Sequence, residues 1–447
     1  MNIQLWTAIA SFDFDNPADE YGFSIRLAIE NSWTDYFTKT AILEYKKFMY
    51  LAATSSEMVS PSEIVDIVWH QHLIFTNLYS DFCRVLGKRI EHVPSTHNKA
   101  DFEKFQKAKE ITQKLYEINF GKQPQEIWDN SNNVFSLNLK SSSTTSKKIT
   151  QKYILGFLAL LFPLYWVISP VLIQIDNPYF LLYYILLYIV SVFLLLEYAK
   201  NAGNTILENL KTNFIINNLT AFELVFFQKN HLEFVVRGVV NNLIENQRVK
   251  VVNNRLKLVV EDWTDNKHEN CIIEIMKEYE PMSYSQLHHI VCNKPIFGQI
   301  EKSIGTIKTV IINSKEFLKI VKIALFVFGI LLSIGVCRII TGLSREKAVG
   351  LLLVVMFILF LVSISIFDRI LNDLFSKRMH FAHLQEKQNT DTQKDWQWNY
   401  FLYGNIAFAF VPLTLPITNN DNSSSSSSDT SSCGSSCGSS CGGCGGD

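Results

Sequence analysis

Two uncharged apolar runs, separated by three residues, constrain the fold of this 447-residue chain more than any other feature. The first run covers residues 153–175 and the second covers residues 179–196, and neither contains a charged side chain. Each is long enough to cross a hydrocarbon core about 30 Å thick as a helix. The sequence therefore predicts a transmembrane helical hairpin over residues 153–198.

A second pair of apolar runs occupies residues 320–337 and 348–367, with Lys322 as its one charged residue. It predicts a second transmembrane hairpin over residues 320–367, and hence four membrane helices. A later apolar segment, residues 400–417, contains a glycine and two prolines. We interpret it as an interfacial segment or one packed on the other helices, with a fifth span as the alternative.

Basic residues gather on one side of both hairpins. The tip of the first hairpin has no Lys or Arg, whereas Lys147, Lys148 and Lys152 precede that hairpin. The tip of the second has three basic residues against eight on its flanks. Because basic loops stay on the cytoplasmic side, we expect cytoplasmic N- and C-termini and a multi-pass protein of the inner or plasma membrane. No signal peptide is expected, since residues 1–23 lack a basic start and an apolar core.

The segment before the first hairpin has the pattern of a helical domain. Apolar residues recur every three or four positions over residues 23–50, which predicts two amphipathic helices joined near Ser32. The next predicted helix has Ser60 as its N-cap and Glu63 three residues later, a capping box. We expect this helix to run unbroken to Gly87.

Within that helix, Asp66 and His70 are four residues apart and share one face. His92 and Cys83 add two more side chains of the kinds that a transition metal binds, so these four residues are a candidate site for zinc or copper. His72 falls on a different, mostly apolar side of the helix and cannot join His70. The preferred interpretation is nevertheless structural: histidines that hydrogen-bond backbone or carboxylate groups, and a buried Cys83.

A family resemblance covers roughly residues 23–128. The pattern is W-H-x-H-L followed by a Cys and then H-x-P, and it is matched by Trp69, His70, His72, Leu73, Cys83, His92 and Pro94. With FSIRLAIENSW and LYEINFGKQPQEIW, it resembles the uncharacterised domain of plant glycine-rich domain-containing proteins and their bacterial relatives. The resemblance implies a fold more than a chemistry. In the structural interpretation of the histidines, which rests on the residues alone, Trp69 is a packing anchor.

A smaller domain is expected between the two hairpins. Two helical patterns are followed by two alternating runs around Asn253-Asn254, a turn pair typical of a β-hairpin. Helix, helix, hairpin is the order of a winged-helix unit. The basic footprint is weak and the net charge is −1, so we expect protein partners or a scaffold role and no nucleic acid.

The end of the chain is of low complexity. Four cysteines lie among Ser and Gly with no apolar residue to build a core: Cys433, Cys437, Cys441 and Cys444. Their C-x3-C-x3-C-x2-C spacing is not that of a zinc finger or ribbon, so we expect a disordered tail, with a soft-metal site as the alternative. Residues 200–447, with LTAFELVFFQKN and the Cys/Gly-rich end, resemble an uncharacterised bacterial membrane-protein family.

The predicted fold is mostly α. Its parts are a helical domain (1–130), a linker (131–152), the two transmembrane hairpins, a cytoplasmic winged-helix-like α+β domain (202–314), a juxtamembrane region (368–418) and a tail (419–447).

Two functions remain open. The preferred one is a non-enzymatic anchor or scaffold that presents cytoplasmic interaction domains and a Cys-rich tail at the lipid bilayer, because no phosphate loop or nucleophile motif is found. The alternative is a membrane-bound metal-dependent enzyme or metal sensor. It requires Asp66, His70 and His92 to converge within about 5 Å and to leave one position open for water.

Overall fold

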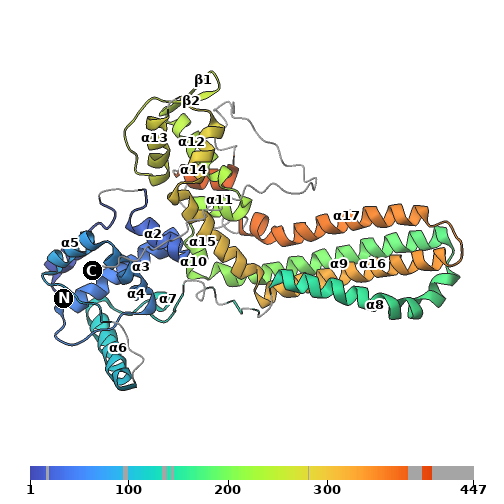
Figure 1. Ribbon diagram of the computed structural model, residues 1–447, viewed down its shortest axis with the longest axis horizontal. Helices are drawn as coiled ribbons and strands as arrows, with labels where there is room; N and C mark the ends of the chain where they lie inside the picture. Colours follow the sequence, from blue (N-terminus) through green and yellow to red (C-terminus); the bar gives the residue numbers. More distant parts are fainter. Residues whose placement is uncertain are drawn as a thin grey trace, which may run out of the picture. The chain divides into compact units, whose positions relative to one another are not determined.

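The computed structural model describes residues 1–404 except 17–19, 94–98, 133–136, 138, 141, 143–144, 280 and 381–394, and only the backbone of 99–102 and 177. The described chain is mostly helical (Figure 1). It divides into two compact units. The larger contains residues 1–12, 35–220 and 304–380, and the smaller contains residues 13–34, 221–303 and 395–404.

In the larger unit, six helices precede the first apolar run and form what we call the helical domain. They are α1 (Ile3–Ser11), α3 (Asp35–Thr54), α4 (Glu63–Ile74), α5 (Thr76–Leu86), α6 (Lys99–Phe120) and α7 (Gln125–Trp128). Helix α3 is central, since α1, α4, α5 and α6 all contact it. Its buried face carries large aromatic side chains, among them Phe37, Tyr45 and Phe48.

The expected long helix is in fact two helices. The N-cap of α4 is Ser62, whose hydroxyl accepts from the Val65 amide, so the predicted capping box at Ser60 and Glu63 is wrong. The Ser60 amide instead donates to the Thr112 hydroxyl, 2.8 Å away. Phe75 has non-helical dihedral angles and separates α4 from α5.

Two other local predictions hold. Gly87 ends α5 with a φ of 77°, a left-handed conformation that favours glycine. Ser32, at a φ of 55°, ends the helix that precedes α3, so the two helices expected over residues 23–50 do join there.

Four long helices confirm the prediction of four membrane spans, and we call them the membrane bundle. They are α8 (Ser146–Gln174), α9 (Asn177–Lys211), α16 (Lys315–Leu343) and α17 (Gly350–Asp373), the last continued by the π-helical turn η2 (Leu374–Arg378). They lie side by side in Figure 1. Helix α16 contacts the other three. All four extend beyond the apolar runs. Because α8 already begins at Ser146, the linker expected to reach residue 152 ends before Ser146.

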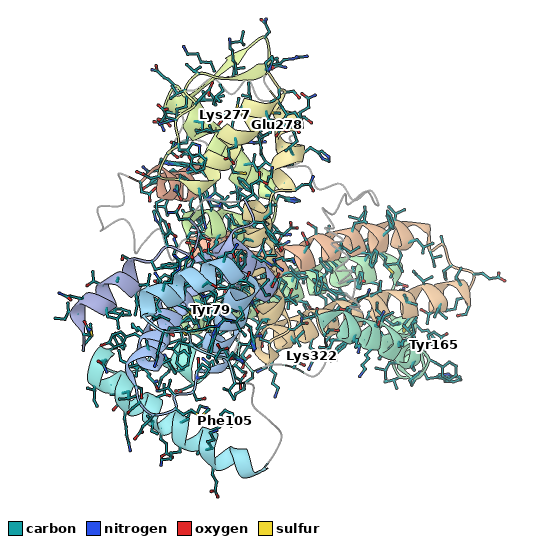
Figure 2. The ribbon with its side chains drawn as sticks, turned by 60° about the vertical axis from the view of Figure 1, so that its left-hand side comes forward. Tyr79, Phe105, Tyr165, Lys277, Glu278 and Lys322 are labelled. Atoms are coloured by element: carbon teal, nitrogen blue, oxygen red, sulfur yellow. The ribbon has the colours of Figure 1, made fainter. Side chains whose placement is uncertain are left out.

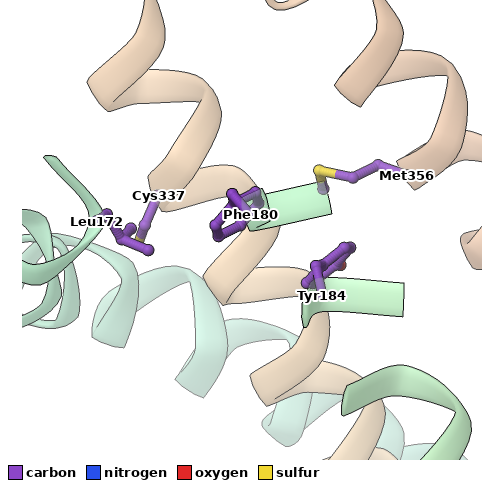
Figure 3. Packing of buried hydrophobic residues seen from close by; sticks show 5 residues of the cluster. All are labelled: Leu172, Phe180, Tyr184, Cys337 and Met356. Carbon is purple, nitrogen blue, oxygen red and sulfur yellow. The ribbon is translucent and has the colours of Figure 1, made fainter. Parts of the chain in front are cut away.

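The bundle core is apolar at its centre, and the buried Tyr184 hydroxyl finds its hydrogen-bond partner within the bundle. Leu172, Phe180, Tyr184, Cys337 and Met356 form one buried cluster (Figure 3). The Tyr184 hydroxyl donates to the Leu331 carbonyl oxygen, 2.9 Å away, across the α9–α16 contact. Such bonds matter in a bilayer because lipid offers no partner for a polar group.

Arg338 lies in α16, although the sequence places it in the join between the second pair of spans. It is buried and donates to two carbonyl oxygens at the end of α8, those of Leu172 and Ile175. Its guanidinium also stacks over the Phe180 ring at 4.8 Å. These carbonyls lack helical partners, so Arg338 caps α8 from a neighbouring helix.

The described part of the smaller unit contains helices and one β-hairpin. Its elements are α2 (Phe23–Asn31), α11 (Ala221–Lys229), α12 (Leu232–Glu245), β1 (Val249–Val252), β2 (Arg255–Leu258), α13 (Lys267–Glu278), α14 (Tyr284–Cys292), the start of α15 (Pro295–Ile312) and α19 (Trp396–Tyr403). The expected hairpin is present: β1 and β2 pair antiparallel, and Asn253 and Asn254 both have positive φ, as a type I′ turn requires.

The apolar segment predicted at 400–417 begins inside α19, and the remainder lies outside the described residues. Helix α19 contacts α11 and α12. The Tyr400 hydroxyl donates to the Phe234 carbonyl oxygen at 2.7 Å, and its ring covers Gly238, where a Cβ would lie 2.6 Å from the ring. The described start of the segment is therefore packed on other helices.

Candidate metal centre

Asp66, His70 and His92 come together on the surface of the helical domain. One ligand atom from each lies within 4.8 Å of the other two. Asp66 bridges the histidines: its Oδ1 is 2.9 Å from His92 Nε2 and its Oδ2 is 3.4 Å from His70 Nδ1. The His70 side chain is 58% exposed, Asp66 35% and His92 16%. Within the described part of the chain, this is the one group of three such side chains with this spacing.

Two of the three residues share one helix, and a hydrogen-bond chain positions the third. Asp66 and His70 are one turn apart on α4. Trp69 Nε1 donates to the Tyr79 hydroxyl at 3.3 Å, and that hydroxyl donates to the Ile90 carbonyl oxygen. The chain fixes the segment that carries His92 against α4, and Trp69 also packs edge-on against the His92 ring at 4.6 Å.

Tyr79, labelled in Figure 2, is the positioning residue that sequence reasoning missed. It lies ten residues after Trp69 on a different helix, α5. No spacing rule connects two helices separated by a break, so only the fold reveals the contact. Burial raises the pKa of Tyr79 above its usual range, which keeps its hydroxyl a donor to Ile90.

His72 and Cys83 lie away from the three converging residues. His72 is fully buried, and its Nδ1 is 2.8 Å from the Tyr45 hydroxyl. Burial lowers the pKa of His72 to about 3, so it is a neutral core histidine. Cys83 is a buried thiol beside Tyr79 and Tyr45, and it is not part of the cluster. Leu73 is half-buried on the same helix. Pro94 and the tail cysteines Cys433, Cys437, Cys441 and Cys444 lie outside the described residues.

The three side chains fit a transition-metal ion. Two imidazoles and a carboxylate are a donor set that zinc and copper both accept. Ligand atoms of a tetrahedral zinc site lie about 3.3 Å apart, so closing the longest separation here takes a shift of about 1.5 Å. The exposed His70 side chain has the freedom to make that shift by rotation.

A cavity of about 470 Å³ opens beside Asp66 and His92. The loop between α3 and α4 forms one wall, and Trp69 and Phe105 line the cavity as well. Its charged rim is mainly acidic, with Glu57, Glu63 and Glu91 against Lys88. A metal held by three protein ligands keeps a fourth position for water or a small ligand, and this cavity gives room for it.

No protein-family model matches this chain, and its comparison with curated proteins and with solved structures gives no significant similarity.

Proposed function

We propose that this chain is a membrane-anchored metalloprotein whose helical domain binds one zinc ion through Asp66, His70 and His92, with copper as the alternative metal. The observation that carries the proposal is the convergence of three ligand atoms within 4.8 Å. Two of the three ligands come from one helix turn, and the third is held in place by the Trp69–Tyr79–Ile90 hydrogen-bond chain. Packed elements thus hold Asp66 and His92 close together, and the exposed His70 side chain closes the site by rotation.

The open coordination position favours a reactive or sensing site over a purely structural one. Structural zinc sites are closed by four protein ligands, whereas catalytic sites keep three and leave one position to water. The cavity beside Asp66 and His92 supplies the space. The scaffold function, in which the histidines only hydrogen-bond to Asp66, is the competing proposal.

Metal content decides between the two. The full-length protein, purified in detergent and supplied with zinc, is compared with His70→Ala, with a deletion of residues 431–447, and with His289→Ala. His289 is exposed on α14 and outside the cluster, so it is a matched control. We expect about one zinc per chain in the wild type, in the tail deletion and in His289→Ala, and none in His70→Ala.

The same set of proteins can contradict the proposal. Loss of zinc with the tail would place the metal on the terminal cysteines, and zinc that persists in His70→Ala would exclude the cluster. His70 is 58% exposed, so its replacement leaves the core intact and loss of metal is not a folding effect. A cobalt-substituted protein tests the open position, because azide entering the coordination sphere changes its visible spectrum.

We propose in addition that α11, α12 and the β1–β2 hairpin form a winged-helix-like unit for protein contacts. Arg237, the basic residue of α12, is buried and paired with Glu233 at 2.6 Å, so it is not available to a phosphate backbone. The resemblance of residues 23–128 to the glycine-rich domain-containing proteins, and of 200–447 to a bacterial membrane-protein family, is likewise a proposal. The basic flanks support an inner-membrane protein with both termini in the cytoplasm.

A further inference from the structure

A small pocket lies at the end of the membrane bundle where α9, α16, α17 and η2 meet. It has a volume of about 190 Å³ and is distinct from the cavity beside His92. Its apolar part is made by Leu196, Phe317, Ile320, Ile370 and Leu374. We call it the Arg369 pocket, after a basic residue on its rim.

The charged part of the Arg369 pocket is basic. Lys200, Arg369 and Arg378 line it, against one carboxylate, that of Asp373. Arg378 Nε donates to Asp373 Oδ2 at 2.6 Å, and its guanidinium also donates to the Lys200 carbonyl oxygen at 2.9 Å. Arg378 and Asp373 therefore build the wall that joins α9 to η2, and their charges offset each other.

The other two cations are available to a ligand. Among the described residues, neither the Lys200 ammonium nor the Arg369 guanidinium has a hydrogen-bond or ion-pair partner, and both side chains are exposed. Glu197 and Asp368 are the nearest acids in sequence, and neither lines the pocket. The pocket thus has two free positive charges beside an apolar surface.

The position of these groups along the helices matches the boundary of a bilayer. Leu196 ends the charge-free run of α9, and Lys200 follows one turn later on the same face. Arg369 stands two residues after Phe367, which ends the charge-free run of α17. Apolar side chains therefore meet acyl chains at the depth where basic side chains meet phosphates.

We propose that the Arg369 pocket binds the phosphate of an anionic phospholipid, with Lys200 and Arg369 as its ligands and the apolar wall against the first part of the acyl chains. A lipid headgroup and a free phosphate ion would both present a phosphate group to these two cations. The apolar wall favours the lipid, because a hydrated ion gains nothing from Ile320, Ile370 and Leu374.

Lipid binding to the full-length protein in detergent tests the proposal by native mass spectrometry. Phosphatidylglycerol and phosphatidylcholine of identical acyl chains are titrated onto the wild type, the double variant Lys200→Gln/Arg369→Gln, and Lys377→Gln. Lys377 is an exposed cation of η2, next to Arg378 of the pocket wall. It does not line the pocket itself, so it is a matched control. Inorganic phosphate is added as a competitor in a separate arm.

We expect phosphatidylglycerol to bind the wild type and Lys377→Gln alike, and the double variant about 10- to 30-fold more weakly, since each basic side chain contributes to anionic-lipid affinity. Phosphatidylcholine carries the same phosphate, but its choline cation offsets the charge, so we expect it to bind the wild type more weakly than phosphatidylglycerol and to lose less affinity in the double variant. Equal phosphatidylglycerol affinity in the double variant and Lys377→Gln would overturn the proposal. Displacement of the lipid by inorganic phosphate alone would show a simple anion site and overturn the lipid assignment. An unchanged melting temperature shows that the variants are folded.

Discussion

Glu44 is a buried acid that the periodicity of α3 does not reveal. Its carboxylate accepts hydrogen bonds from the Tyr116 hydroxyl at 2.7 Å and from Trp128 Nε1 at 2.8 Å, and Lys47 Nζ lies 2.7 Å away. One side chain therefore joins α3 to α6 and α7. A buried charge with several donors stabilises the native packing only while all of its partners remain.

Glu44→Gln removes the charge that balances Lys47 and replaces one acceptor oxygen with an NH2 group, although three donors face this side chain. We expect the free energy of unfolding to fall by about 2 to 4 kcal/mol. Thermal unfolding of the detergent-solubilised protein, followed by tryptophan fluorescence, measures this loss. The control is Glu110→Gln on the exposed side of α6, which should leave the transition unchanged. Coincident transitions for the two variants would contradict the role of Glu44.

Lys308 lies on α15, the helix before the third span, and it makes the folding stability of the chain depend on pH. Burial lowers the pKa of Lys308 to about 8, and its Nζ lies 5.3 Å from the centroid of the Phe375 ring. The unfolded chain keeps this amine protonated up to about pH 10.4, so between about pH 8 and 10.4 the unfolded state binds more protons than the folded one. The contribution of Lys308 to stability therefore increases as the pH rises through that window.

Lys308→Met should remove this dependence. We expect a higher melting temperature than wild type at pH 7, and a difference that shrinks as the pH approaches 10. Melting curves of both proteins at several pH values between 7 and 10 measure it. A difference that stays constant with pH would mean that Lys308 is equally protonated in the folded and unfolded states.

At the scale of elements, close helix packing depends on small residues of α16. A Cβ on Gly335 would lie 2.5 Å from Met356 Sδ and 2.9 Å from the Tyr184 hydroxyl. The Tyr184 hydroxyl is held by its bond to the Leu331 carbonyl, so it cannot move aside without losing that bond. Glycine at this position lets α9 and α17 approach α16 at the buried cluster of Figure 3.

Gly335→Ala should therefore lower the stability of the membrane bundle by about 1 to 3 kcal/mol, the usual cost of overpacking a core. Gly156→Ala is the matched control, because a Cβ on Gly156 of α8 meets no atom within 4 Å. Resistance to denaturation by a harsh detergent, read by far-UV circular dichroism, compares the two variants. Equal resistance would mean that Met356 and Tyr184 rearrange freely.

Features that depend on residues close together in the sequence could be predicted from it, whereas features that depend on contacts between distant segments could not. The spans are recognisable because a charge-free run is a local property, and Asp66 and His70 can be paired because four residues make one helix turn. The place of His92 depends on Tyr79, across the break at Phe75. The burial of Arg338 likewise depends on the carbonyls of another helix, and no spacing within one segment encodes such contacts.

At the scale of the whole molecule, the membrane bundle fixes which segments share a side of the membrane. Arg345 of the second tip donates to the Ile173 carbonyl oxygen of the first at 3.2 Å, so the two tips lie at one end of the bundle. Four spans then place the start of α8 at Ser146 and the end of η2 at Arg378 at the other end. The basic flanks favour the cytoplasm for that end.

Cysteine labelling in intact cells tests this orientation. All four described native cysteines are buried, and deleting residues 431–447 removes the other four, so the background is low. We expect Asp176→Cys and Ser344→Cys, both at exposed tip positions, to react with a membrane-impermeant maleimide from outside. Lys377→Cys should react only after permeabilisation. The opposite pattern would reverse the orientation and put the Asp66, His70 and His92 cluster outside the cell, where its metal would come from the surroundings and not from the cytoplasm. Labelling of one tip from each side would contradict the four-span bundle itself.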